Sequence, residues 1–191
     1  MRLTGAVVLK GAALRAGAIA CSAGTLVMTY SLLERRRIEA QFAKAIFDVL
    51  AEETGRERAA EILAKAVIRL ATEAGAAFAG QRREPPDKMA PDDPAGLLAY
   101  VEILALWQQD GALMIDLKVK ERERLEFDVK RCRYAEMYRE LGMAELGRVL
   151  SCNRDGAFCT GFNPAIRLTR TQTIMEGADC CDFRYAITKG T

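Results

Sequence analysis

The sequence contains no histidine among its 191 residues, although it contains six cysteines. Histidine is the usual general base and a common metal ligand, because its unperturbed pKa lies near neutral pH. Its absence excludes catalytic triads and zinc sites that depend on imidazole. The absence narrows the expected chemistry to thiol and carboxylate side chains.

The chain also lacks a long hydrophobic run and a strong charge bias. No stretch reaches the roughly 18 to 20 apolar residues that a membrane-spanning helix needs, since Lys10 and Arg15 interrupt the apolar N-terminal segment. Lys and Arg total 28 against 26 for Asp and Glu, and the two signs are interleaved, which argues against nucleic-acid binding. We therefore expect a cytoplasmic protein with a small-molecule substrate, no membrane contact and no nucleic-acid partner.

The N-terminal segment, residues 1–27, is expected to be an extension that precedes a working start at Met28. Its end, AIAC, loosely resembles a lipoprotein cleavage site, so an export signal is a second interpretation of this segment. Reduced thiols are expected rather than disulfides, because the chain is neither small nor loop-dominated and Cys180 and Cys181 are sequence neighbours.

A helical hairpin is predicted for residues 28–80. Ser31 and Glu34 form a capping-box pattern that starts one helix, and Gly55 ends it. A second helix is expected over residues 56–79. Apolar residues at helical spacing predict the inward faces, which are Leu33, Ile38, Phe42, Ile46 and Val49 in the first helix and Ala59, Leu63, Val67, Leu70, Ala74 and Phe78 in the second.

Residues 81–96 hold four of the five prolines and are predicted to form a linker or surface loop. A third helix is expected over residues 97–109, after which two-residue alternation predicts strands. The strands are expected at residues 112–120, 125–129, 165–175 and 181–187, with a short helix at 134–141. The expected fold is α+β, with a helical hairpin and a third helix packed on a small antiparallel sheet of about four strands. Residues 97–191 would hold the catalytic region, and residues 28–191 would form one domain.

Thiols and carboxylates are the candidates for chemistry. Cys132, Cys152 and Cys181 fall at predicted junctions, where a shared pocket would place them. The segment SCNRDGAFCTGFNP, residues 151–164, is expected to be a loop, in which Asp155 serves either a site or an NRDG turn. Neighbouring arginines, and for Cys132 a helix N-terminus, would lower the pKa of Cys132 or Cys152 and make it a nucleophile. The acid or base would be a carboxylate, with Asp155, Asp182 and Glu136 as the candidates.

Polar side chains around these cysteines are candidates for substrate binding. Arginine can grip a carboxylate bidentately, and asparagine can both donate and accept hydrogen bonds. Arg170 has two interpretations, a ligand contact or a structural pair with Asp182. The other candidates of this kind are Asn153, Arg154 and Asn163.

An alternative hypothesis is a module that binds a small ligand or a metal through Cys132, Cys152 and Cys181 without turnover. The chain has no CxxC pair, and the spacing of Cys152 and Cys159 matches no zinc pattern. The enzyme hypothesis therefore assigns no metal and no other cofactor. A long helical hairpin beside a small sheet makes a homodimer a further expectation.

A set of short motifs gives residues 131–185 a family resemblance. The region holds a cysteine before a short helix, a cysteine just before an aspartate, a GFNP turn, an RT strand and a glycine followed by CDF. This pattern resembles the L-2-amino-thiazoline-4-carboxylic acid hydrolase family, and the ERRRIEA opening is similar to the start of such proteins. The matching positions are Cys132, Cys152, Asp155, Gly161 to Pro164, Arg170, Thr171, Gly177, Cys181, Asp182 and Phe183, whereas Cys159 and Cys180 fall outside the pattern.

The resemblance implies hydrolysis of a cyclic isothiourea. A nucleophile adds to the amidine-like ring carbon, and a C–N or C–S bond then breaks to leave a carbamoyl-cysteine product. It implies Cys152 or Cys132 as nucleophile, Asp155 as acid/base or amidine anchor, and Arg170 as clamp for the substrate carboxylate. Cys181 would line the floor of the pocket. The expected enzyme is a hydrolase of carbon–nitrogen bonds other than peptide bonds.

Overall fold

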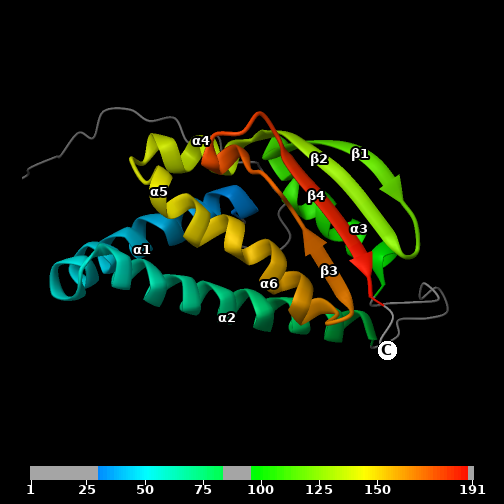
Figure 1. Ribbon diagram of the computed structural model, residues 1–191, viewed down its shortest axis with the longest axis horizontal. Coiled ribbons are helices and arrows are strands. Elements are labelled where there is room, and N and C mark those ends of the chain that lie inside the picture. Colours follow the sequence, from blue (N-terminus) through cyan, green and yellow to red (C-terminus); the bar gives the residue numbers. More distant parts are fainter. Residues whose placement is uncertain (1–29, 84–95, 189–191) are drawn as a thin grey trace, which may run out of the picture.

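The computed structural model describes residues 30–83 and 96–188. The expected extension, residues 1–27, lies outside the described residues. The fold is α+β, as predicted, with a helical N-terminal region followed by a four-stranded antiparallel sheet (Figure 1). Within the described ranges, every helix is too short or too polar to cross a membrane.

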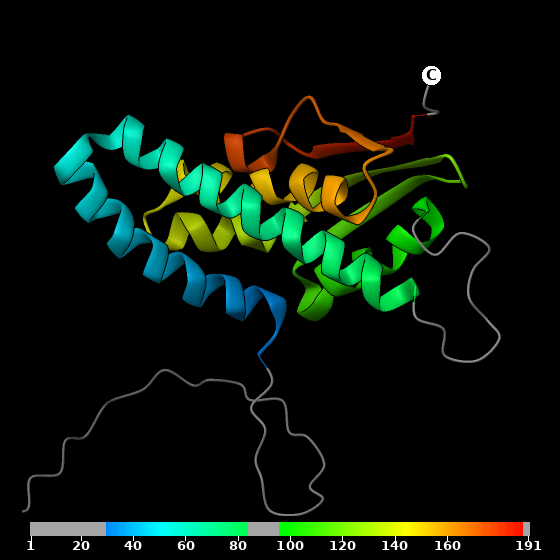
Figure 2. The ribbon, with the colours of Figure 1, turned by 90° about the horizontal axis from the view of Figure 1, so that it is seen from below.

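The predicted helical hairpin is present. Helix α1 (Leu32–Thr54) and helix α2 (Arg56–Arg83) meet at Gly55, whose φ of 86° closes α1 (Figure 2). The capping box is also confirmed, because the Glu34 amide donates to Ser31 Oγ at 3.2 Å and the Ser31 amide donates to Glu34 Oε2 at 2.9 Å. These bonds fix where α1 begins.

The predicted inward face of α1 is confirmed at Leu33 and wrong at its other four positions. The buried residues of α1 are Leu33, Ala40 and Phe47, at intervals of seven residues. A seven-residue repeat gives a narrow seam between paired helices, and a small alanine in it lets them approach closely. The large side chains therefore point away, and Ile38, Phe42, Ile46 and Val49 are exposed. In α2, Ala59, Leu63 and Val67 are buried as predicted, whereas Leu70 is exposed.

The segment after the hairpin differs in part from its prediction. Helix α2 continues to Arg83, so the start of the predicted linker is helical, and residues 84–95 lie outside the described part of the chain. Helix α3 (Leu97–Trp107) is confirmed and is followed by a 3₁₀ turn, Gln109–Gly111, that leads into the sheet.

The sheet contains β1 (Leu113–Lys120), β2 (Arg124–Cys132), β3 (Ile166–Thr169) and β4 (Cys181–Ile187) in the order β1-β2-β4-β3. Its buried face carries Leu125, Phe127 and Val129 from β2 with Cys181, Phe183 and Tyr185 from β4. The opposite face is polar and includes the pair of Arg184 with Asp128 at 2.8 Å. One face therefore packs on the protein and one meets solvent, as predicted.

Two strand predictions need correction. The alternation expected in β1 holds only in part, because β1 is an edge strand with two register shifts and its Leu117 is 48% exposed. The strand expected over residues 165–175 ends at Thr169, and Ile174–Glu176 forms a 3₁₀ turn instead.

The main correction concerns residues 151–164, which were expected to be a loop. The chain runs from β2 into α4 (Arg133–Glu140), α5 (Ala144–Gly147), a π-helical turn (Arg148–Cys152) and α6 (Asn153–Phe162). The NRDG sequence is thus the first turn of a helix. Tertiary packing overrides the turn preference, because α6 lies along α2 (Figures 1 and 2).

Two glycines make this packing close. A Cβ on Gly75 of α2 would overlap the carbonyl oxygen of Phe158, and a Cβ on Gly161 of α6 would overlap that of Thr72. Only glycine lets the two backbones approach so closely. The glycines that favour a turn in the sequence therefore serve a helix–helix contact in the fold.

Candidate active site

A cavity of about 350 Å³ lies where the helices meet the buried face of the sheet. Its lining includes residues of the helices α1, α2, α3, α4 and α6 and of the strands β1, β2 and β4. Residues far apart in the sequence therefore share its walls. Six residues singled out in the sequence line it, namely Cys132, Cys152, Arg154, Asp155, Arg170 and Cys181. The convergence brings thiols, a carboxyl group and guanidinium groups into one small space.

Cys152 and Asp155 lie on neighbouring turns at the start of α6. Cys152 ends the π-helical turn, and Asp155 follows three residues later, which places both on the same side of the helix. Short π-helical turns are often found at functional sites. In this position the turn directs Cys152 toward the cavity wall rather than along the outer face of α6.

Arg170 holds these two residues together. Its Nη1 donates to Asp155 Oδ2 at 2.6 Å, and its Nη2 donates to the backbone oxygen of Cys152 at 3.3 Å. The guanidinium carbon also lies 4.9 Å from the centroid of the Phe183 ring, on the floor formed by β4. Arg170 is therefore already occupied by the protein, and its partner is Asp155 rather than Asp182.

Among the described residues, Asp155 is the single carboxyl group that lines the cavity. Burial raises the pKa of Asp155, and the Arg170 guanidinium opposes that rise. The two side chains are only 22% and 16% exposed, so water screens the pair poorly. A carboxyl group in this setting can both accept and return a proton at a higher pH than an ordinary aspartate.

Burial raises the pKa of all three thiols that line the cavity. Burial raises the pKa of Cys132 to about 11, although its Sγ accepts a hydrogen bond from the Ala135 amide at 3.4 Å. Burial, followed by the charge of Asp155, raises the pKa of Cys152. Burial also raises the pKa of Cys181, whose Sγ accepts from the Ile174 amide at 3.2 Å. The expected lowering of the Cys132 and Cys152 pKa values is therefore wrong.

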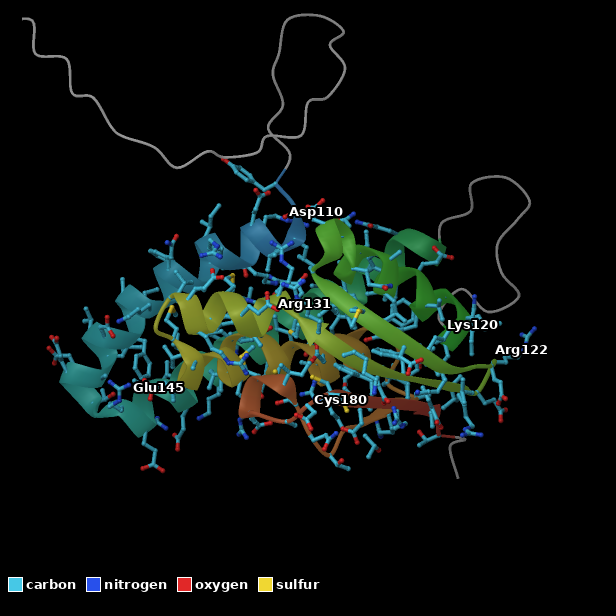
Figure 3. The ribbon with its side chains drawn as sticks, turned by 90° about the horizontal axis from the view of Figure 1, so that it is seen from above. Asp110, Lys120, Arg122, Arg131, Glu145 and Cys180 are labelled. Atoms are coloured by element: carbon cyan, nitrogen blue, oxygen red, sulfur yellow. The ribbon has the colours of Figure 1, made fainter. Side chains whose placement is uncertain are left out.

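The arginines beside Cys132 do not offset the effect of burial on its pKa, because they are engaged elsewhere. Arg131, labelled in Figure 3, is 59% exposed and pairs with Glu136 at 2.7 Å. Arg133 donates to the backbone oxygen of Asp110 at 2.7 Å. Sequence neighbours on a strand or helix point in different directions, so adjacency did not bring these charges to the Cys132 sulfur.

The alternative of a metal-binding thiol cluster receives no geometric support. Within residues 30–83 and 96–188, no three Cys, Asp or Glu side chains are placed to hold one metal ion. Thiolate ligands would need to converge within about 2.3 Å of a single ion. The described cysteines are all free, and Cys132, Cys152 and Cys181 reach the cavity as separate thiols.

Four residues predicted to bind substrate do not line the cavity, namely Asn153, Asn163, Thr171 and Asp182. Asn153 begins α6, and Asn163 accepts a hydrogen bond from the Ala165 amide at 2.9 Å where α6 ends. Asp182 accepts from the amide and hydroxyl of Thr171, at 3.0 and 2.6 Å. These bonds shape the segments that carry Asp155 and Arg170, away from the cavity itself.

The sequence did not single out several lining residues that matter to the chemistry. Arg35 and Arg36 come from the first turns of α1, Trp107 from the end of α3 and Tyr134 from α4. The only signal for Arg35 and Arg36 was the run of three arginines directly after the capping box, and interleaved acidic residues masked it. These two arginines reach the site because α1 packs beside α4.

The family model described as L-2-amino-thiazoline-4-carboxylic acid hydrolase matches residues 35–185. The chain belongs to this family. No curated protein matches the chain. The segment shared with the L-2-amino-thiazoline-4-carboxylic acid hydrolase family begins at Arg35 and extends past Phe183, so it contains every cavity residue discussed above. The name of the family describes a hydrolase, which agrees with a cavity that contains thiol and carboxyl groups.

Proposed function

We propose that this protein is a hydrolase that opens a small cyclic amidine or isothiourea carboxylate, similar to 2-amino-thiazoline-4-carboxylate, at a ring C–N bond. The observation that carries the proposal is the pairing of Cys152 and Asp155 on one cavity wall, held by Arg170. The family name supports hydrolysis of such a ring. A cavity of about 350 Å³ suits a small ring and excludes a polymer.

In the first step, Cys152 acts as the nucleophile. Its sulfur attacks the amidine carbon while its proton passes to the Asp155 carboxylate, and an electron pair of the C–N double bond moves onto nitrogen. The raised pKa of Asp155 makes the carboxylate a better base than an ordinary aspartate. A cationic amidine in the cavity would also stabilise the developing thiolate, which burial disfavours.

In the second step, the ring C–N bond breaks. The nitrogen leaves with the proton held by Asp155, because a carboxylic acid beside it can neutralise the leaving amine. Water then adds to the S-linked carbon, giving its proton to Asp155, and the Cys152 sulfur leaves and takes that proton back. The net reaction consumes one water and restores both the thiol and the carboxylate.

The other cavity groups have supporting roles in this proposal. Arg170 positions Asp155 and Cys152, which replaces its expected role as carboxylate clamp. Cys132 is the alternative nucleophile. Cys152 is preferred because Arg170 hydrogen-bonds both its backbone oxygen and the Asp155 carboxylate, whereas the Cys132 sulfur accepts from the Ala135 amide. Cys181 lies on β4 beneath the pair and lines the floor.

The free thiols also bear on where the enzyme works. The five described cysteines are unpaired, and three of them must stay reduced for the cavity to keep its shape and chemistry. Reduced cysteines are typical of the cytoplasm. We therefore infer a cytoplasmic enzyme.

Substitution of the proposed pair tests the function. Turnover of 2-amino-thiazoline-4-carboxylate should fall at least about 100-fold in both Cys152→Ala and Asp155→Asn, since each removes one partner of the proton transfer. Cys180→Ala is the control, because Cys180 lies outside the cavity, and it should retain activity. Unaltered circular dichroism would show that the variants fold. Full activity in either cavity variant, or a loss in Cys132→Ala alone, would refute the assignment of Cys152.

The product identifies the bond that breaks. Cleavage of the C–N bond leaves the sulfur carbamoylated and the amine free, whereas cleavage of the C–S bond releases a free thiol. A thiol reagent added to the reaction with catalytic amounts of enzyme should therefore detect no new thiol. Stoichiometric thiol release would overturn the C–N assignment while leaving the nucleophilic pair in place.

A further inference from the structure

The charges that line the cavity do not balance. Four arginines line it, Arg35, Arg36, Arg154 and Arg170, against the single carboxyl group of Asp155. Because Asp155 bonds Arg170 at 2.6 Å, that pair is neutral as a unit when both are ionised. The remaining three arginines form a separate group, called here the arginine cluster, with residues Arg35, Arg36 and Arg154.

Within the described part of the chain, a single carboxylate serves the arginine cluster. One oxygen of Glu39, Oε2, accepts from Arg36 Nη1 at 2.6 Å and from Arg154 Nη2 at 2.9 Å. Arg35 forms no ion pair with any described residue. Three positive charges face one negative charge, which leaves a surplus of two.

This surplus lies in partly buried surroundings. The side chains of Arg36 and Arg154 are 24% and 19% exposed, so solvent screens their charges only in part. Burial lowers the pKa of Arg154, and the charge of Arg36 lowers it further, which shows that the two guanidinium groups repel each other. An anion between them would relieve that repulsion. The bridging oxygen of Glu39 shows that the pair already accommodates a carboxylate from one side.

The cluster, Tyr134 and the thiols line the same cavity. Arg35 is exposed, whereas Cys132 is half-buried. Burial raises the pKa of Tyr134 to about 12, with Arg36 opposing the rise and Cys132 adding to it, so Tyr134 lies near both. A small molecule held by an anionic group at the cluster would extend along Tyr134 toward the reactive groups.

We propose that the arginine cluster is the binding subsite for the carboxylate of the substrate. This inference rests on the proposed function and explains which substrates the enzyme would select. The carboxylate binds Arg35, Arg36 and Arg154 beside Glu39, and the ring points inward to the Cys152 and Asp155 pair. The enzyme therefore selects small rings that carry a carboxylate and discriminates against the same rings without it.

Trp107 offers a direct reading of binding. It is the only tryptophan of the chain and it lines the cavity, so its fluorescence reports occupancy without any turnover. The probes are 2-amino-thiazoline-4-carboxylate and 2-aminothiazoline, which differ only in the carboxylate. The wild-type protein should bind the first at least about tenfold more tightly than the second, as expected for hydrogen bonds to charged groups.

Arginine substitutions test whether the cluster causes the preference for the carboxylate probe. Arg36→Gln and Arg35→Gln together should weaken binding of the carboxylate probe roughly tenfold or more and change binding of 2-aminothiazoline less than about twofold. Arg37→Gln is the matched control, because Arg37 is adjacent in sequence but pairs with Glu140 at 2.8 Å outside the cavity. It should leave both affinities within about twofold.

The outcomes separate this inference from the proposed function. A protein that prefers the carboxylate probe, loses that preference in the arginine variant and never turns the probe over keeps the subsite and refutes the hydrolase. Equal binding of the two probes by the wild type, binding of neither, or an equal loss in Arg37→Gln overturns the subsite, whatever the turnover.

Discussion

At the scale of the residue, one buried carboxyl group takes the place that histidine holds in most acid–base chemistry. Asp155 is largely shielded from solvent, with a side chain 22% exposed, and its pKa reflects the balance between burial, which raises it, and the Arg170 guanidinium, which lowers it. A chain without histidine can thus obtain a titrating base by burying an aspartate beside an arginine.

The balance predicts the pH dependence of the enzyme. The carboxylate form of Asp155 is the base, so kcat/KM should fall as pH drops through the raised pKa, above the ordinary value of about 3.9. In Arg170→Gln the opposing charge is lost, the pKa of Asp155 rises further, and the acid limb of the pH–rate profile should move to higher pH. Steady-state kinetics between pH 4 and 9 measure this shift.

Arg167→Gln serves as the control for that experiment. Arg167 donates to the backbone oxygen of Pro164 at 2.8 Å and does not line the cavity. Its loss should leave the acid limb in place. An acid limb that stays unmoved in Arg170→Gln would show that Asp155 is not the titrating base.

The residues of the site were predictable in part. Cys152, Asp155 and Arg170 lie in the motif-rich region 131–185, so their resemblance to a family was visible in the sequence. Arg35 and Arg36 lie more than 90 residues before that region, and only the packing of α1 against α4 brings them to the cavity. Thiol pKa values could not be predicted either, because they depend on burial rather than on sequence neighbours.

At the scale of the element, the contact between α2 and α6 decides whether Cys152 and Asp155 face the cavity. Capping boxes, a C-terminal glycine and strand alternation act over a few residues, so α1, the hairpin and the buried face of the sheet were predictable from them. Helix α6 was not predictable in this way, since Gly156 and Gly161 weaken its intrinsic helix propensity. Tertiary contacts with α2 compensate for this weakness in the folded protein.

Alanine at either close glycine should separate these helices. Gly75→Ala and Gly161→Ala each place a methyl group against the backbone of the other helix, which no rotamer change can relieve. We expect a loss of roughly 1–3 kcal/mol in the free energy of unfolding, with reduced activity because α6 carries the reactive pair. Urea denaturation and turnover measure the two effects.

Gly80→Ala is the matched control in the same helix. A Cβ at Gly80 would meet no atom within 4 Å. Alanine there should be neutral or stabilise the protein by up to about 1 kcal/mol through helix propensity. A loss at Gly80 as large as at Gly75 would show that helix propensity, and not the close contact, controls the stability of this region.

At the scale of the whole molecule, the cavity lies between two hydrophobic clusters. One joins the sheet to α3 and the end of α6, and the other joins the helical hairpin to α4 and α5. Leu113, Cys132 and Ile174 pack against both clusters. Since the site contains residues from both clusters, its geometry depends on how the two clusters are positioned relative to each other.

We expect the two clusters to unfold as one cooperative unit, as a single domain would. Trp107 packs on the sheet-side cluster and reports it by fluorescence, while far-ultraviolet circular dichroism reports the helices, including the hairpin. Urea transitions followed by the two signals should coincide. Leu63→Ala, which removes a buried side chain of the hairpin cluster, should shift both transitions together by about 2–4 kcal/mol.

Leu70→Ala provides the comparison on the same helix, because Leu70 is 58% exposed and its truncation should cost less than about 0.5 kcal/mol. If Leu63→Ala moved the circular dichroism transition and left the Trp107 transition in place, the hairpin would be an independent unit. The arginines of α1 could then leave the thiols without unfolding the sheet. Coincident shifts would instead show that the two clusters unfold together. A ligand that contacts both clusters would then stabilise the whole chain, because its binding free energy adds to the free energy of unfolding.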